Sequence, residues 1–210
     1  TYTRVTGFGK ESGAVTLEPV RYKSAPMRPH PASFWNPRFS FSRGIMIRDC
    51  PYDPQYPYAF HGEEHIMSLR LYTRGYDFFC PMRPIVRHKV RRQGRLGTFW
   101  EVWHNDSVRR KAEELACIRM GVLLGLVPAA QVTNPVVLDK IGDGEIHGLG
   151  TVRDRLGFMT MTGVDPYGEF ISPHAKLGTR EDAMHDEIIA KFESRKQFEQ
   201  ALVYTSRNSK

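Results

Sequence analysis

The order of apolar and polar positions divides the chain near residue 103 into a half of strands and loops and a half of helices. In the first half, short apolar runs predict strands at residues 14–20 and 43–47. Between them, residues 24–39 are rich in proline. Because proline lacks a backbone donor and restricts the residue before it, this stretch is predicted to be an extended surface loop.

A helix is predicted over residues 62–74, since Glu63 and Glu64 fall in its first turn and two arginines in its last, as the helix macrodipole favours. Gly75 stands where a left-handed C-cap is expected. Residues 76–79 and 84–90 then predict two further strands.

The second half is predicted to hold three helices. The first is capped by Asp106 or Ser107 and closed by Gly125, the second runs from Thr151 toward Gly163, and the third follows Thr179. The apolar face of the first helix is assigned to Val108, Ala112, Leu115, the stem of Arg119, and Val122. In the third helix, Met184, Ile188 and Phe192 recur every four residues.

Composition narrows the class of protein. About 40% of the residues are hydrophobic, which is enough for a core, and no apolar run reaches the roughly 20 residues needed to cross a bilayer. The net charge of +7 raises nucleic acid as a partner, but no nucleic-acid-binding motif is found, so none is expected. Much of the charge lies in one basic run, which could hold a diphosphate or form a solvated face: Arg83, Arg87, Lys89, Arg91, Arg92 and Arg95.

The cysteines are few and isolated. Cys50, Cys80 and Cys117 lack the CxxC spacing of a zinc or redox site and are interpreted as buried or half-buried thiols. This usage favours a reducing compartment, although one disulfide is also compatible with it.

Residues 51–81 are the densest in candidate chemistry. Glu63 and Glu64 stand together behind Gly62, which would let a ligand approach the backbone. Adjacent carboxylates in a cleft can accept hydrogen bonds from sugar hydroxyls or take part in acid–base chemistry, and the plain alternative is that they only complement the helix N-terminus. His61 and His65 are four residues apart, but Gly62 replaces the glutamate that a zinc-protease motif needs.

Four motifs in order resemble one family over residues 34–165: FWNPRFSFSRG, then the 51–81 run with FHGEEHIMSLRLYTRGYD, then VRHKVRRQGRLGTFWE, then IHGLGTVRDRLGFMTMTGVD. They resemble the polypeptide α-N-acetylglucosaminyltransferases, the family that includes the Skp1 hydroxyproline enzyme. The resemblance implies an α/β fold, the C-terminal part of a GT-A-type nucleotide-sugar glycosyltransferase. It also implies UDP-GlcNAc as donor, an acceptor protein that is Skp1-like or mucin-like, and retention of anomeric configuration.

The resemblance also assigns site residues. It places Glu63 and Glu64 at the acidic pair that faces donor sugar and acceptor hydroxyl, and His88 at a ligand of a divalent cation, Mn²⁺ or Mg²⁺. From the residues alone, a histidine in the setting of His88 is more often an ordinary hydrogen-bonded histidine than a metal ligand. Charge and position suggest Arg91, Arg92 and Arg95, with Gly62, for the donor diphosphate. Phe34 and Trp35 are assigned to acceptor binding because they lie in a loop of the kind that carries binding function.

One part of the family pattern is missing. No Asp-x-Asp metal motif occurs in these residues, and residues 143–145 are only a distant imitation. We therefore expect residues 1–103 to be the C-terminal half of a catalytic domain whose nucleotide-binding part precedes Thr1, and residues 104–210 to be its helical extension. The alternative is a non-catalytic binding module of the same fold. A cytoplasmic location is expected, or a lumenal Golgi one if an upstream anchor exists.

Overall fold

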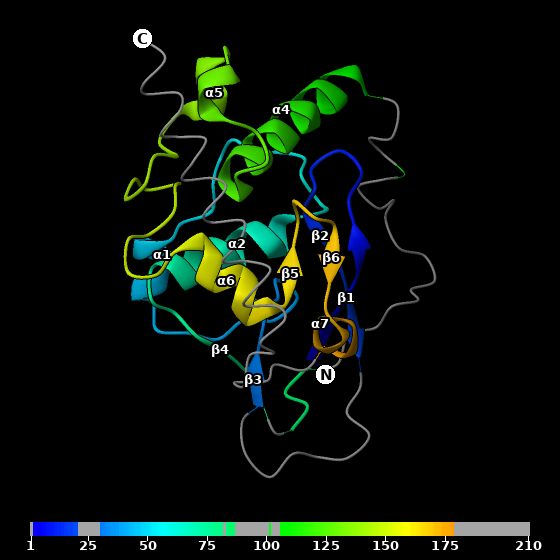
Figure 1. The fold of residues 1–210 in the computed structure, drawn as a ribbon. Coiled ribbons are helices and arrows are strands. Elements are labelled where there is room, and N and C mark those ends of the chain that lie inside the picture. Colours follow the sequence, from blue (N-terminus) through cyan, green and yellow to red (C-terminus); the bar gives the residue numbers. More distant parts are fainter. Residues whose placement is uncertain (1, 21–29, 82, 87–100, 102–105, 179–210) are drawn as a thin grey trace, which may run out of the picture.

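A computed structural model describes residues 2–20, 30–81, 83–86, 101 and 106–178. Its described elements are three small antiparallel sheets and a set of helices, so the protein mixes α and β structure as expected. β1 (Tyr2–Phe8) pairs with β2 (Val15–Val20), β3 (His30–Ala32) with β4 (Phe78–Cys80), and β5 (Val164–Asp165) with β6 (Phe170–Ile171). Figure 1 shows most of the helices to the left of the β1–β2 hairpin, while α7 (Pro173–Leu177) lies against β1.

The helix α2 (Glu63–Thr73) lies in the interior. Seven consecutive residues from His65 to Leu71 are buried, polar ones included, so the helix is enclosed on all sides rather than amphipathic. It packs against α4 (Ser107–Leu124) and α6 (Arg155–Thr162). Its N-terminus therefore sits at a fixed place in the core.

Short elements complete the fold. They are α1 (Ile45–Asp49), the 3-10 turn η1 (Ala129–Gln131), α5 (Pro135–Leu138) and α7 (Pro173–Leu177). The main core draws on both sides of residue 103, with Val5, Ile66, Met120 and Phe158 among its members. The predicted division at 103 falls among residues that the structure does not describe, and it stays a prediction.

Several expected elements are confirmed. The strand at 14–20 and the helix at 62–74 appear as β2 and α2, and Gly75 has the left-handed backbone that was expected, with φ of 93°. Asp106 caps α4 by accepting a hydrogen bond from the Arg109 amide, and Gly125 ends it. The strand at 76–79 is found shifted, as β4.

Other expectations are wrong. Residues 45–49 form the helix α1 instead of a strand over 43–47. Of the strand predicted at 84–90, residues 84–86 are not in a strand and residues 87–90 lie outside the described residues. The cap of α6 is Asp154 instead of Thr151, because the amides of Val152 and Arg153 are bonded to the Thr73 carbonyl at the end of α2.

The apolar face assigned to α4 is right only in part. Arg119 is buried and Val122 packs against the core, but Val108 is 69% exposed. The side that α4 buries is centred on Ala116, Arg119, Met120 and Leu123. The third predicted helix, after Thr179, lies outside the described residues.

Candidate functional site

The two carboxylates singled out in the sequence occupy the first turn of α2. Glu63 and Glu64 are both half-buried, and within the described part of the chain neither side chain accepts a hydrogen bond or pairs with a cation. Burial, followed by the negative charge of Glu64, raises the pKa of Glu63. Two adjacent carboxylates that remain available while partly desolvated are suited to accept hydrogen bonds from a polyhydroxylated ligand.

Tyr52 is influenced electrostatically by this pair, although it was not among the predicted site residues. Its ring meets the Trp35 ring edge to face at 5.9 Å between centroids. Burial, with the charges of Glu63 and Glu64, raises the pKa of the Tyr52 phenol, which places that phenol within electrostatic range of both carboxylates. The only sequence signal for Tyr52 was its place in the aromatic run before Gly62.

Ser68 ties the segment around Trp35 to the same helix. The Trp35 amide donates to the Ser68 hydroxyl at 2.8 Å, and that hydroxyl donates to the Glu64 carbonyl one turn earlier. The two sequence-distant parts of the predicted site, Trp35 and the acid pair, are thus joined through α2.

Phe34 and Trp35 are largely buried, at 4% and 7% exposure. Phe34 packs edge to face against His65 and Phe158, with ring centroids 5.8 and 6.0 Å away. Phe34 therefore has a packing function in the core, while Trp35 touches the surface-exposed Tyr52. Acceptor binding by the pair stays a prediction.

Gly62 is needed for the geometry of the helix start. Its φ of 93° is in the left-handed region, and a Cβ there would lie 2.7 Å from the Ala14 Cβ and 3.0 Å from the Met120 Sδ. The residue thus lets β2, α2 and α4 approach one another at the point where Glu63 and Glu64 emerge. Its predicted contact with the donor stays a prediction.

We expect Gly62→Ala to lower the free energy of unfolding by about 2–3 kcal/mol, because left-handed strain and crowding add together. Urea denaturation measures the loss. Gly44→Ala is the matched control, since nothing lies within 4 Å of its added Cβ and its φ is −57°. Equal stability of the two variants would contradict this explanation of Gly62.

The predicted ligands His88, Arg91, Arg92 and Arg95 lie outside the described residues. Among the residues that are described, no three His, Cys, Asp or Glu side chains come together as a cation site. Within the described part of the molecule, Glu63 and Glu64 alone are too few ligands to hold a divalent cation. The roles of His88 and the three arginines stay predictions.

A comparison with protein families identifies the chain. The model of the family described as glycosyltransferase (GlcNAc) matches residues 3–168, well over half of the sequence. The chain belongs to this GlcNAc glycosyltransferase family. No curated protein and no solved structure matches it.

In this GlcNAc glycosyltransferase the matched region includes both the acid pair and the Gly-Leu-Gly loop at 148–150. That loop crosses the C-terminal end of α2, where the Gly150 amide donates to the Thr73 hydroxyl at 2.8 Å. A Cβ on Gly150 would lie 2.5 Å from the Thr73 carbonyl group. Close packing of the loop against α2 therefore explains why position 150 is occupied by a glycine.

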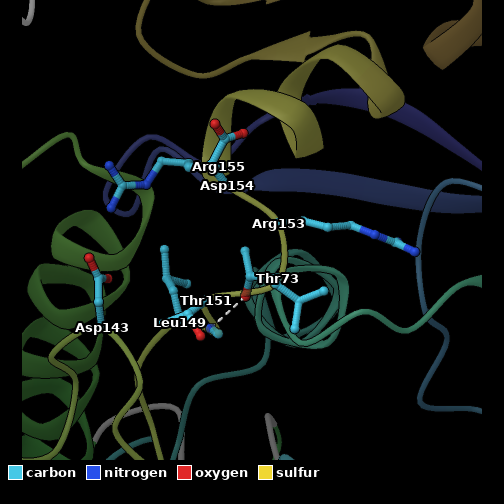
Figure 2. Close-up of a pocket in the computed structure, with 9 residues that line it drawn as sticks. Thr73, Asp143, Leu149, Thr151, Arg153, Asp154 and Arg155 are labelled. Carbon is cyan, nitrogen blue, oxygen red and sulfur yellow. Dashed lines mark hydrogen bonds between the residues drawn. The ribbon is translucent and has the colours of Figure 1, made fainter.

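A hollow of about 510 Å³ lies beside the loop (Figure 2). Its lining includes Asp143, Thr151 and two arginines that already have protein partners. Arg153 extends away to pair with both oxygens of Asp77 at 2.9 and 3.0 Å, and Arg155 donates to the Leu123 carbonyl at 2.9 Å. At 1.5 Å per residue, the hollow is about 15 Å along α2 from the acid pair, so the two are separate.

A buried ion pair was also missed by the sequence interpretation. The Arg119 Nε donates to Asp53 at 2.7 Å, and the side chains are 1% and 0% exposed. The Arg119 terminal nitrogens donate to the Val136, Val137 and Asp139 carbonyls, which end α5. The one sequence signal for this ion pair was Arg119, a charged residue on a helix face that was assigned as apolar.

The structure offers no helix, among the residues it describes, with the length and apolar character of a membrane span. The compartment of this glycosyltransferase stays a prediction.

Proposed function

We propose that this family member takes part in transfer of N-acetylglucosamine from UDP-GlcNAc to a hydroxyproline or threonine hydroxyl of an acceptor protein. The acceptor oxygen forms a bond to the anomeric carbon, the bond from that carbon to UDP breaks, and the hydroxyl proton is released. The observation that carries the proposal is the pair of available, half-buried carboxylates at the start of α2. The family match supports the donor sugar.

In this proposal, Glu63 and Glu64 accept hydrogen bonds from hydroxyls of the sugar or acceptor and orient them. Burial strengthens such bonds because water competes less for the carboxylates. The raised pKa of Glu63 suits it to hold a shared proton. The GT-A-type fold, retention of configuration, and assistance by Mn²⁺ or Mg²⁺ with His88 as a ligand belong to the proposal and rest on the resemblance.

The test is UDP release from UDP-GlcNAc by the purified 210-residue chain, with and without Mn²⁺, together with mass spectrometry of threonine and hydroxyproline peptides. Metal-dependent UDP release and a peptide heavier by one N-acetylhexosamine are expected. No release of UDP under either condition would contradict catalysis.

Such a result would favour the second candidate, a non-catalytic module that binds the acceptor. The observation behind this candidate is the missing Asp-x-Asp motif in the sequence. It predicts that acceptor peptides bind while UDP-GlcNAc does not.

Glu64→Gln is expected to lower the transfer rate by about 100-fold, the usual effect of removing one hydrogen bond that strengthens in the transition state. The change in UDP affinity should be much smaller, because UDP does not contact this carboxylate in the proposal. Rates and UDP titrations together measure the difference. Glu145→Gln, at an exposed carboxylate, is the control. Equal losses of rate and UDP affinity in Glu64→Gln would instead indicate a structural function at the helix start.

A further inference from the structure

Residues 38–49 form a surface with unusual exposure, called here the 38–49 surface. Every residue in it is exposed except Met46, which is half-buried. It nevertheless carries four large apolar side chains, Phe39, Phe41, Ile45 and Ile47, exposed by 42%, 92%, 41% and 67%. Helix α1, which lies within it, buries none of its residues. Grouped apolar exposure of this kind marks an interaction site more often than single exposed residues do.

The segment is nevertheless anchored to the protein. Met46 packs against the small core cluster around Trp35, and the Trp35 indole nitrogen donates to the Ser40 hydroxyl at 2.8 Å. Asp49 accepts a hydrogen bond from the Tyr76 hydroxyl, and Cys50 then enters the core. A fixed backbone that turns apolar side chains outward is suited to binding, because little ordering is needed when a partner arrives.

The charge of the same segment is positive. Arg38, Arg43 and Arg48 are exposed, and none forms an ion pair with a residue in the described part of the chain. The one carboxylate of the segment, Asp49, is already engaged by Tyr76. Apolar side chains among unpaired arginines complement a partner that combines acidic and apolar residues.

One end of the 38–49 surface is connected to the candidate site through Trp35. Ser40 is bonded to Trp35, the Trp35 ring contacts Tyr52, and the Trp35 amide is linked through Ser68 to the Glu64 carbonyl. The Ser40 end of the surface thus adjoins the Trp35–Tyr52 contact, while its other end, at Asp49, is bonded to Tyr76 just after α2.

We propose that the 38–49 surface binds an acidic, apolar-containing segment of the acceptor polypeptide. This inference rests on the proposed function, and it defines the acceptor by its chemistry. Phe41 and Ile47 supply apolar contact, while Arg38, Arg43 and Arg48 select carboxylates.

The test measures peptide binding in the absence of donor, so its outcome is separate from that of the UDP-release assay. The probe is a fluorescent peptide that alternates Asp or Glu with Phe around a threonine, and the comparison peptide has Asn and Gln in place of the acids. Fluorescence anisotropy is expected to show binding of the acidic peptide at least about tenfold tighter, with the preference weakened by added salt.

Arg43→Glu and Phe41→Ser should each weaken binding of the acidic peptide by about tenfold or more. Both positions are exposed, so folding should be retained, which circular dichroism checks. Arg110→Glu, at an exposed arginine on α4, is the matched control and should bind as the unaltered chain does.

Three results would overturn the proposal. One is equal affinity for the acidic and neutral peptides. The second is binding to phosphatidylcholine–phosphatidylserine vesicles, lost in Arg43→Glu, without binding to the peptide. The third is a dimer in light scattering that Phe41→Ser converts to a monomer, since the surface would then be occupied by a second copy of the chain.

Discussion

Replacing Arg119 by alanine is expected to lower the free energy of unfolding by about 3–5 kcal/mol, the usual cost of removing one partner of a buried ion pair. The variant would leave the Asp53 carboxylate fully buried, with the Gln55 amide as its remaining hydrogen-bond donor among the described residues. It would also remove the donor that satisfies three carbonyls at the end of α5. Because α4, α5 and the loop before α2 all meet at this guanidinium, its loss affects the support of the acid pair.

Urea denaturation of the variant and the unaltered chain measures this loss. Arg110→Ala, on the exposed side of the same helix, should change stability by less than about 0.5 kcal/mol. In the double variant Asp53→Ala and Arg119→Ala, the losses should fall short of additivity by at least about 1 kcal/mol, since the unpaired carboxylate is gone. Additive losses, or a loss below about 1 kcal/mol in Arg119→Ala alone, would show that the pair does not hold these elements together.

The elements that the sequence predicted well are those with local start and stop signals. Asp106 caps α4 through its own side chain, and Gly125 can adopt the left-handed backbone at its end, so both signals act within one turn. The acidic first turn of α2 is similarly local. The cap of α6 was predicted three residues too early because the bonds from residues 152 and 153 to the Thr73 carbonyl depend on a distant element.

The strand predicted at 43–47 failed for a related reason. Ile45 and Ile47 alternate as in a half-buried strand, but neither is buried, and Met46 between them is the residue that packs inward. Alternation of apolar and polar residues indicates a strand only when one face of that strand packs against a core. Here the apolar positions face outward, which is the basis of the proposed acceptor surface.

The candidate site was predicted in part. The sequence motif Gly62-Glu63-Glu64 indicated one part of the site. Tyr52 and Ser68 join the site only through contacts formed by folding. The buried Arg119–Asp53 pair connects residues 66 positions apart, and single-sequence patterns do not report pairs at that separation. The sequence excludes a zinc-protease motif at His65 but does not indicate that this side chain is buried in the core.

Acidification is expected to destabilise the protein strongly through His65. This side chain is 1% exposed, its Nδ1 accepts a hydrogen bond from the Val15 amide at 3.1 Å, and its ring stacks on Phe158. Burial lowers the pKa of His65 to about 3 in the folded chain. In the unfolded chain the pKa is the ordinary value of about 6.5.

The direction in which folding stability changes with pH follows from the two pKa values of His65. Below pH 6.5 the unfolded chain takes up a proton at His65 that the folded chain does not, so folding stability falls as the pH falls from 6.5 toward 3. The contribution of His65 is lost at up to about 1.4 kcal/mol per pH unit, or about 2 kcal/mol by pH 5 and between 4 and 5 kcal/mol over the whole window.

His65→Gln isolates this contribution, because glutamine can still accept from the Val15 amide but does not titrate. The stability difference between the unaltered chain and His65→Gln, followed by urea denaturation from pH 8 to pH 4, should shrink as the pH falls. Contributions common to both chains, such as those of His147 and Glu63, cancel in that difference, and a constant cost of losing the stacked ring does not alter its slope. A difference that does not change with pH would mean that His65 takes up its proton as readily in the folded chain as in the unfolded one, and the Val15 amide would then need another acceptor at low pH.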